Sequence, residues 1–306
     1  MRFGMEIPQK KLFKIEEILS ILDENKISFK FYGDKTIEIF GMSHIKKIKR
    51  NTICYFESTN GLFEGDDVVF VCKNKEISKN CIIVEDPKMV FYLLSNLLNL
   101  KEKYYNRFID PSCVLGKNVA IGESYISKGV RLGDNVVIGD GVFVGKNTII
   151  DSNSSIGCLG ISWTWNGDNK IFLNSYGQTK IGNNCVISSN VKIVRGIYTN
   201  DTVLGDSVFI APGTAIGHST IIEDKVHMAN NCTIGGSCKI GEDSFLGCAS
   251  VVASGASIGK NTILGAGCVV VPKQDLESSS VYVGIPAQKI KNLEKSYSLK
   301  SIPKRK

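Results

Sequence analysis

The chain has 306 residues, of which 43% are hydrophobic and 22% are charged, with a formal net charge of +7. This length fits one large domain or two ordinary ones, and the composition excludes a disordered chain. No apolar run reaches the roughly 18 residues of a membrane span, so we expect no membrane-spanning segment. The N-terminal segment MRFGMEIPQKKLFKIEEI has neither an apolar core nor a small-residue cleavage site. It therefore predicts no signal peptide and a cytoplasmic protein.

The charge and the cysteines narrow the class of ligand. Much of the positive charge lies in the C-terminal segment KSYSLKSIPKRK, and no basic stripe is interleaved with aromatic residues. We therefore expect anionic small molecules such as phosphates as ligands, and no nucleic acid. The ten cysteines are scattered singly without C-x-x-C spacing, which predicts reduced thiols and no metal site.

Residues 1–105 predict a small α/β domain. Apolar residues at helical spacing predict a helix over 9–25, and a second helix over 87–100 has Pro87 near its start. Between them lie four strand-like runs: TIEIF, TICYF, DVVFVC and NCIIVE.

Residues 106–283 are dominated by a six-residue repeat in which an aliphatic residue often precedes glycine. The longest run holds 12 positions in register: Leu204, Ile210, Ile216, Ile222, Met228, Ile234, Ile240, Leu246, Val252, Ile258, Leu264 and Val270. A period of six fits neither an α-helix nor a heptad and is typical of a parallel β-helix. Each six residues would form one side of a triangular prism, with the aliphatic residue inside and Gly, Asn or Asp at the corner.

The repeat is interrupted at three places. Two steps, Ile121 to Leu132 and Ile193 to Leu204, are each one residue shorter than two full sides, which predicts sides with one residue missing. Residues 157–180 contain both tryptophans and predict an extruded loop, which binds ligand or packs passively against a neighbour. Residues 284–306 follow the repeat and predict a C-terminal extension with a short helix over 284–298.

The repeat resembles the left-handed β-helix acyltransferases, and the left-handed winding is an implication of that resemblance. The order of EIFGMSHIKKIKRNTICYFES, NCIIVEDPKMVFYLLSNLLN, IDPSCVLGKNVAIGE and IGHSTI along the chain resembles the UDP-3-O-acylglucosamine N-acyltransferases of lipid A synthesis. The resemblance implies a nucleotide-binding α/β domain, a β-helix, a C-terminal helical piece and a homotrimer with active sites between neighbouring helices.

The implied reaction is attack of a sugar amine on an acyl thioester, which needs a general base and a donor to the oxyanion. The chain has three histidines, and His218 matches the base of the family. Gly236 lies one full coil, or three sides of the prism, after His218. In the family, the matching backbone amide donates to the oxyanion. The competing interpretation of His218 is a surface residue on a coil. His227 precedes an inward methionine and is expected on the surface, and His44 is expected to be structural.

The acceptor site of the family is matched only in part. The segment after TICYF contributes Phe56, Ser58 and Asn60 to the implied nucleotide site, with serine where the family has asparagine. Gly255, beside Ser254, stands where the lipid A enzyme has a second histidine. These departures favour another nucleotide-linked amino sugar as acceptor. The remaining candidate acceptor residues are Trp163 and Trp165 in the loop and Arg195 in the segment VRG.

The donor is implied by the end of the repeat. The segment VVVPKQDLESSSVYVGIPAQKIK resembles the terminal coil of hexapeptide acetyltransferases that use acetyl-CoA. We therefore expect acyl-CoA as co-substrate, with acyl carrier protein as the alternative and no tightly bound cofactor. The candidate donor residues are Ser254, Gly255, Ala266, Pro286 and Lys289.

The leading hypothesis is an N-acyltransferase that acts on a nucleotide-linked amino sugar for surface polysaccharide or lipopolysaccharide. The alternatives are the lipid A enzyme itself, with a long acyl chain on carrier protein, and a non-catalytic β-helix scaffold. A γ-type carbonic anhydrase is excluded because it needs three metal-binding histidines, and only His218 and His227 lie in the repeat.

Overall fold

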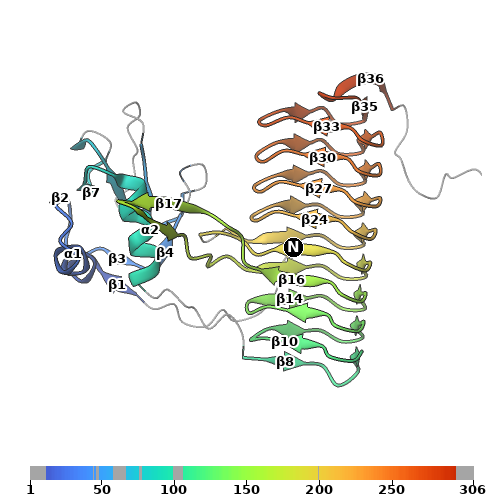
Figure 1. The fold of residues 1–306 in the computed structure, drawn as a ribbon, viewed down its shortest axis with the longest axis horizontal. Coiled ribbons are helices and arrows are strands. Elements are labelled where there is room, and N and C mark those ends of the chain that lie inside the picture. Colours follow the sequence, from blue (N-terminus) through green and yellow to red (C-terminus); the bar gives the residue numbers. More distant parts are fainter. Residues whose placement is uncertain are drawn as a thin grey trace, which may run out of the picture. The chain divides into compact units, whose positions relative to one another are not determined.

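A computed structural model describes residues 12–43, 45, 48–57, 67–75, 78–98, 106–198 and 200–293. The chain divides into two compact units, which are described separately (Figure 1). The N-terminal unit takes residues 1–102 together with 161–176 and 197–200, and the helix unit takes the rest of the chain. Three of the sequence candidates, His44, Ser58 and Asn60, lie outside the described residues.

The N-terminal unit is built on a five-stranded sheet with the order β2-β7-β6-β5-β4. Strands β4 to β7 are parallel, and β2 is antiparallel to β7. Strands β1 and β3 form a separate antiparallel pair. The bounds are β1 Phe13–Lys14, β2 Lys30–Tyr32, β3 Glu38–Ile39, β4 Gly41–Met42, β5 Thr52–Tyr55, β6 Val68–Cys72 and β7 Cys81–Ile83. The four predicted strand runs are therefore confirmed, with β1, β2 and β4 in addition.

Both predicted helices are present, α1 over Ile15–Glu24 and α2 over Pro87–Leu97. At the start of α1, the amide of Lys14 donates to Glu17, and at the start of α2, Asp86 accepts from the amide of Met89 at 2.9 Å. Pro87 occupies the first turn of α2, where a missing N–H costs nothing. The apolar sides of the helices share one buried cluster with the sheet. Neither helix is long and apolar enough to cross a membrane, and the described chain contains no other candidate.

The two excursions from the repeat complete this unit. Strands β17 (Trp163–Asn166) and β18 (Asn169–Phe172) form an antiparallel hairpin, and Figure 1 shows β17 beside α2. The hydroxyl of Tyr176 donates to the carbonyl of Ser95, and the side-chain amide of Asn96 donates to the carbonyl of Phe172 at 2.7 Å. The excursions also contribute four side chains to the buried cluster: Leu173, Tyr176, Ile197 and Tyr198. The segment predicted as an extruded loop is thus an ordered part of the N-terminal unit.

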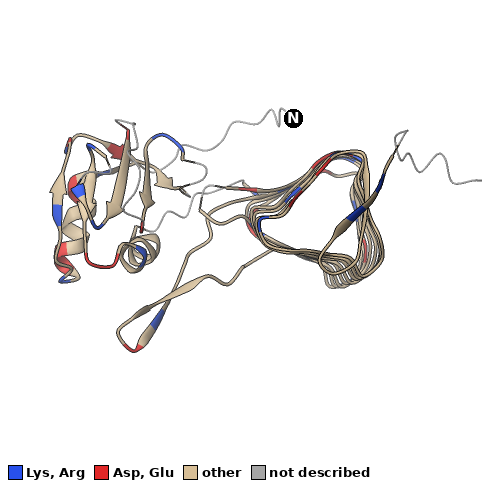
Figure 2. Cartoon of the chain, turned by 90° about the horizontal axis from the view of Figure 1, so that it is seen from above, with Lys and Arg blue, Asp and Glu red and all other residues tan. Residues whose placement is uncertain are grey.

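The helix unit is a parallel β-helix with three faces, and the coils superpose as a triangle when seen end-on (Figure 2). The nine-stranded face holds β8 Phe108–Ile109, β11 Tyr125–Ile126, β14 Val142–Val144, β19 Thr179–Ile181, β22 Thr202–Leu204, β25 Ile221–Ile222, β28 Lys239–Ile240, β31 Ser257–Ile258 and β34 Asp275–Leu276. The ten-stranded face holds β9 Val114–Leu115, β12 Arg131–Leu132, β15 Ile149–Ile150, β20 Val186–Ile187, β23 Phe209–Ile210, β26 His227–Met228, β29 Phe245–Leu246, β32 Ile263–Leu264, β35 Ser280–Val283 and β36 Gln288–Asn292. The eight-stranded face holds β10 Ala120–Ile121, β13 Val137–Ile138, β16 Ser155–Cys158, β21 Lys192–Val194, β24 Ala215–Ile216, β27 Thr233–Ile234, β30 Val251–Val252 and β33 Val269–Val270.

The repeat explains this architecture. The aliphatic residues of the 12-position run are all buried in one continuous core. The corners contain residues with positive φ, such as Asn231 at 59° and Ser219 at 57°, a conformation that asparagine tolerates well. Side-chain amides also bond from coil to coil, as from Asn118 to Asn135 and from Asn135 to Asn153 at 3.2 Å. These corner contacts hold successive coils in register.

The two shortened steps in the repeat have different causes. Between Ile121 and Leu132 the side is one residue short, as predicted, because Ile126 on β11 points inward and is fully buried. Between Ile193 and Leu204 that prediction is wrong. Strand β22 directly follows β21 around the prism, so this step is a single corner enlarged by the excursion at 197–200.

The C-terminal extension also differs from the prediction. Residues 288–292 form strand β36, antiparallel to β35, and not a helix. The physical reason is that the last coil leaves an edge of unpaired backbone groups, which a further strand satisfies. Residues 294–306 lie outside the described chain.

Candidate active site

The candidate site lies at one corner of the prism, where the chain passes from the eight-stranded to the nine-stranded face. We call it the insertion corner, because both excursions leave the helix there, between β16 and β19 and between β21 and β22. The next passage, between β24 and β25, is a regular corner and contains His218. His218 thus occupies the first regular corner after the two enlarged ones.

His218 packs against Gly236 one coil later. Strands β24 and β27 pair with Ile216 opposite Ile234, which brings the two residues to equivalent places on adjacent coils. A Cβ atom built on Gly236 would lie 2.4 Å from Nε2 and 2.5 Å from Cε1 of His218. Such distances are far inside van der Waals contact. The half-buried imidazole can adopt this position only because residue 236 has no side chain.

The backbone amide of Gly236 is available for a ligand. In the described part of the chain its N–H donates to no acceptor. At the same corner nearer the N-terminal end of the helix, the corresponding amide of Glu123 donates to Oδ1 of Asp140, one coil later, at 2.8 Å. The residue one coil after Gly236 is Ser254, and no such bond joins the two among the described residues. The site therefore combines an imidazole with an available backbone donor.

Neighbouring groups fix the geometry of the corner. Thr202 Oγ1 accepts from the amide of Ser219 and donates to the carbonyl of Val194, both at 2.8 Å. Gly160 lies on another side of His218. A Cβ atom built on Gly160 would lie 4.0 Å from Cβ and Cδ2 of His218 and 2.9 Å from Cγ1 of Val194. Neither Thr202 nor Gly160 was predicted from the sequence. Coil arithmetic would have found them only if the lengths of the excursions had been known.

Arg195 adds a buried cation in the same column. By the register of β21 and β24, in which Ile193 faces Ile216, it occupies the place one coil before His218. Its side chain is 8% exposed, and Nε donates to the carbonyl of Gly177 at 3.0 Å. Nearby, Lys180 and Asp201 form an ion pair at 2.7 Å that joins the ends of the two enlarged corners. The structure therefore places Arg195, His218 and Gly236 at the same corner of three successive coils.

The candidate donor residues fall into separate groups. Ser254 and Gly255 follow β30 at the insertion corner, one coil beyond Gly236. Ala266 lies at a different corner, between β32 on the ten-stranded face and β33 on the eight-stranded face, and the exposed Pro286 follows one coil later. Lys289 on β36 pairs with Glu277 at 2.5 Å. Within one helix these residues do not form a single groove, because positions two sides apart occupy different corners of a three-sided coil.

The candidate acceptor residues of the N-terminal unit lie at two places. Phe56 is half-buried just after β5, and its amide continues the sheet by donating to the carbonyl of Val71. Trp163 and Trp165 project from one side of the hairpin and are 39% and 52% exposed. The ammonium of Lys170 lies 4.4 Å from the ring centre of Trp163 and 5.3 Å from that of Trp165. These residues form an exposed aromatic surface with a cation upon it.

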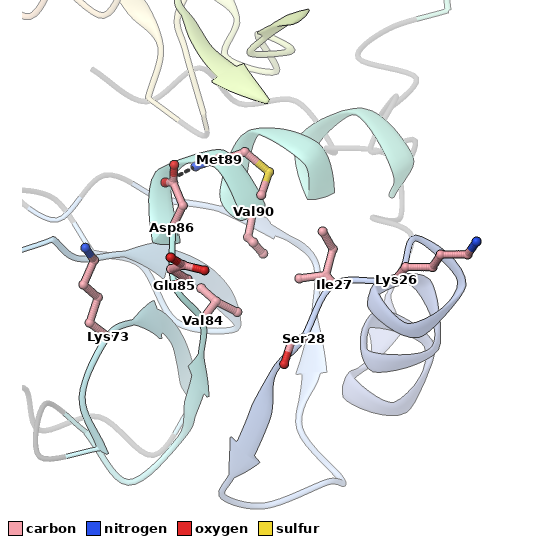
Figure 3. A pocket seen from close by; sticks show the side chains of 9 residues that line it. All are labelled: Lys26, Ile27, Ser28, Lys73, Val84, Glu85, Asp86, Met89 and Val90. Atoms are coloured by element: carbon pink, nitrogen blue, oxygen red, sulfur yellow. Dashed lines mark hydrogen bonds between the residues drawn. The ribbon is translucent and has the colours of Figure 1, made fainter. Parts of the chain in front are cut away.

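The N-terminal unit also contains a cavity of about 650 Å³ at the carboxyl ends of β6 and β7, where α2 begins. Figure 3 shows its lining, in which Lys26 and Lys73 are accompanied by Glu85 and Asp86. Phe56 is not among the lining residues. The mixed charge of the cavity gives it no clear preference for an anionic ligand.

The described residues contain no cluster of three or more histidine, cysteine, aspartate or glutamate side chains suited to a metal ion. All ten cysteines are free thiols, and most are buried. Burial raises the pKa of Cys185 to about 11 and that of Cys54 to about 12, which keeps these thiols protonated at neutral pH.

Comparison with known proteins agrees with the repeat. Residues 201–236 and 237–272 match the bacterial transferase hexapeptide family (six repeats), and residues 112–146 match the hexapeptide repeat of succinyl-transferase. The bifunctional protein GlmU of Clostridium kluyveri is 25% identical over 183 residues, which are 56% of this chain and 35% of that protein. The chain thus spans about a third of the length of the curated relatives it matches.

Two solved structures are similar to part of the chain. LpxA from Acinetobacter baumannii is 24% identical, with a TM-score of 0.43, and the match covers 61% of this chain and 72% of that one. The UDP-N-acetylglucosamine acyltransferase of Francisella novicida is 22% identical, with a TM-score of 0.46, and the match covers 60% and 70%. The chain thus contains hexapeptide repeats of the kind found in bacterial transferases, folded as a three-faced parallel β-helix.

Proposed function

We propose that this protein is an N-acyltransferase that moves an acyl group from an acyl thioester to the amine of a nucleotide-linked amino sugar. Its product would serve the synthesis of surface polysaccharide or lipopolysaccharide in the cytoplasm. The observation that carries the proposal is that the imidazole of His218 fills the space that a side chain on Gly236 would take, beside the available N–H of Gly236.

In the proposed reaction His218 is the general base. It takes a proton from the sugar amine as the amine attacks the thioester carbonyl. When the tetrahedral intermediate collapses, the C–S bond breaks and the imidazolium returns the proton to the departing thiolate. The N–H of Gly236 donates to the oxyanion of that intermediate. A backbone donor held by a rigid coil stabilises the developing charge without having to reorganise.

Two sets of side chains are proposed for the acceptor. Arg195 is a fixed cation in the column of His218 and suits a phosphate of the nucleotide. Phe56, Trp163 and Trp165 are proposed to contact the base or the sugar by stacking, with Ser58 and Asn60 after Phe56. This assignment rests on residue chemistry and on the resemblance of the segment after β5.

For the donor, we favour acyl-CoA over acyl carrier protein, with no tightly bound cofactor. Ser254 and Gly255 are the donor candidates that share the corner of His218. Ala266, Pro286 and Lys289 lie elsewhere on the same helix, so they can act on the same donor only from a neighbouring copy. The proposed homotrimer supplies that copy.

The test is acyl transfer to a panel of UDP- and dTDP-linked amino sugars, with acetyl-CoA, long-chain acyl-CoA and acyl carrier protein as donors. The substitution His218→Ala should reduce turnover by roughly 10²–10⁴-fold, the usual contribution of a general base, while the affinity for the nucleotide sugar persists. Thr233→Ala, on the exposed side of neighbouring β27, is the matched control and should retain full turnover. Near-normal turnover of the His218 variant would overturn its assignment as base. No transfer with any donor would favour a non-catalytic scaffold.

A further inference from the structure

The hairpin β17–β18 presents two sides of different character. On one side lies the cross-strand pair of Thr164 and Ile171, and Ile171 packs against the buried cluster of the N-terminal unit. The neighbouring pairs alternate with this one along the strands, so their side chains point the other way. These pairs are Trp163 with Phe172 and Trp165 with Lys170. The outward side of the hairpin therefore carries three aromatic rings and one cation.

The ammonium of Lys170 lies beside both indoles. It is 4.4 Å from the ring centre of Trp163 and 5.3 Å from that of Trp165, and the two indoles meet edge to face at 83°. Throughout the described residues no carboxylate forms an ion pair with Lys170, although Asp168 lies in the turn of the same hairpin. Indole faces attract a cation but supply no opposite charge. Lys170 is therefore held in place and remains able to bind an anion.

Phe172 adds an open aromatic ring next to this cation. It is 55% exposed, and within the described part of the chain it makes no contact with another ring. Its backbone is fixed, because Asn96 of α2 donates to its carbonyl at 2.7 Å and the amide of Leu173 donates to the carbonyl of Ser162 at 2.8 Å. Residues two apart on a strand are about 6.6 Å from each other. Phe172 and Lys170 thus offer a flat face and a positive charge side by side.

We propose that the outward side of this hairpin binds the nucleoside diphosphate of the acceptor, with Phe172 stacked on the base and Lys170 bound to the diphosphate. The inference rests on the proposed function and deepens it, because it names the part of the acceptor that each residue binds. A nucleoside diphosphate carries a flat base and an anion a short distance apart, so it satisfies both groups at once. Since stacking accepts any base, the hairpin selects for a nucleotide and not for one particular base.

Two features of the hairpin disfavour a lipid surface as the ligand. Its turn, from Asn166 to Asn169, is polar and contains Asp168, so insertion would carry a carboxylate toward the lipid. The ammonium of Lys170 lies over the indole rings, so it would be buried together with them. A small ligand that brings its own anion avoids both penalties.

The test is equilibrium dialysis of the full chain with UDP and with dTDP, at low and at raised salt. Lys170→Met should weaken binding of both nucleotides by roughly tenfold to hundredfold, the usual contribution of a charged hydrogen bond. It should also make the binding less sensitive to salt, because the screened charge pair is gone. Lys170→Arg keeps the charge and should retain most of the affinity.

The stacking partner and the control complete the design. Phe172→Leu should weaken binding by about fivefold or more and leave the salt dependence as it is in the wild type. Lys30→Met removes a lysine from an exposed position of β2 and should bind both nucleotides like the wild type. Circular dichroism checks that each variant is folded.

The inference fails if Lys170→Met binds UDP as well as the wild type does, if Lys30→Met loses as much affinity, or if Phe172→Leu loses none. It also fails if the wild type binds vesicles of anionic phospholipid and no nucleotide. In each of these cases acyl transfer by the wild type, with its loss in His218→Ala, would leave the proposed function standing. The expected pattern of nucleotide binding without any acyl transfer would instead reject the proposed function and keep this nucleotide site.

Discussion

A Cβ atom on Gly236 would lie 2.4 Å from Nε2 of His218, so the coil that provides the amide also sets the position of the imidazole. The substitution Gly236→Ala should therefore displace the ring and lower turnover by about 10²-fold or more, as misplacement of a catalytic group does. Steady-state kinetics with the best substrate pair would measure it.

Gly267→Ala is the control for this variant. A methyl group there meets no atom within 4 Å, and Ala249 already holds the same left-handed conformation one coil earlier. The control should keep normal turnover. A fully active Gly236→Ala enzyme would show that the contact with His218 is not needed for catalysis.

Both tryptophans of the chain lie on the hairpin β17–β18, so intrinsic tryptophan fluorescence reports on this segment alone. If Trp163 and Trp165 contact the acceptor, a nucleotide-linked amino sugar should change the emission in a saturable way. His218→Ala should show the same titration, because the base is not needed for binding. Turnover of the sugar without any change in emission would remove both tryptophans from the acceptor site.

The anchoring of the hairpin can be tested by cavity formation. Leu173 is 5% exposed and belongs to the buried cluster of the N-terminal unit. Leu173→Ala should lower the free energy of unfolding of that unit by about 2–4 kcal/mol. Ile161→Ala, in the same excursion but 81% exposed, should cost less than about 0.5 kcal/mol. Denaturant titration compares them, and equal effects would contradict the burial of Leu173 in this unit.

The thiols should differ in reactivity. Burial raises the pKa of Cys54 to about 12 and that of Cys185 to about 11, so at about pH 8 both remain protonated and poorly nucleophilic. Cys248 is exposed at a corner of the helix. A disulfide reagent should therefore label Cys248 fastest, and raising the pH toward 11 should accelerate labelling of the buried thiols. Cys248→Ser should abolish the fast phase, and persistence of that phase would contradict the assignment.

The sequence by itself determined the solenoid. An aliphatic residue every sixth position can be buried only if each six residues form one side of a prism, so the inward positions from Leu204 to Val270 were predictable one by one. The same arithmetic paired His218 with Gly236, because no insertion lies between them and three regular sides complete one coil. Local periodicity is sufficient wherever each coil contacts only its neighbours.

Only the tertiary structure decided what the interruptions do. The spacing from Ile193 to Leu204 fits either two sides with one residue missing or a single step with an enlarged corner. Only the pairing of β21 and β22 with their neighbouring strands shows that the corner is enlarged. Nor does the sequence indicate that Leu173 and Tyr198 complete the core of a unit formed by residues far away in the chain. Such contacts arise from packing between distant segments, which no local period records. For that reason the base and its coil were predictable, whereas Gly160 and Thr202 were not.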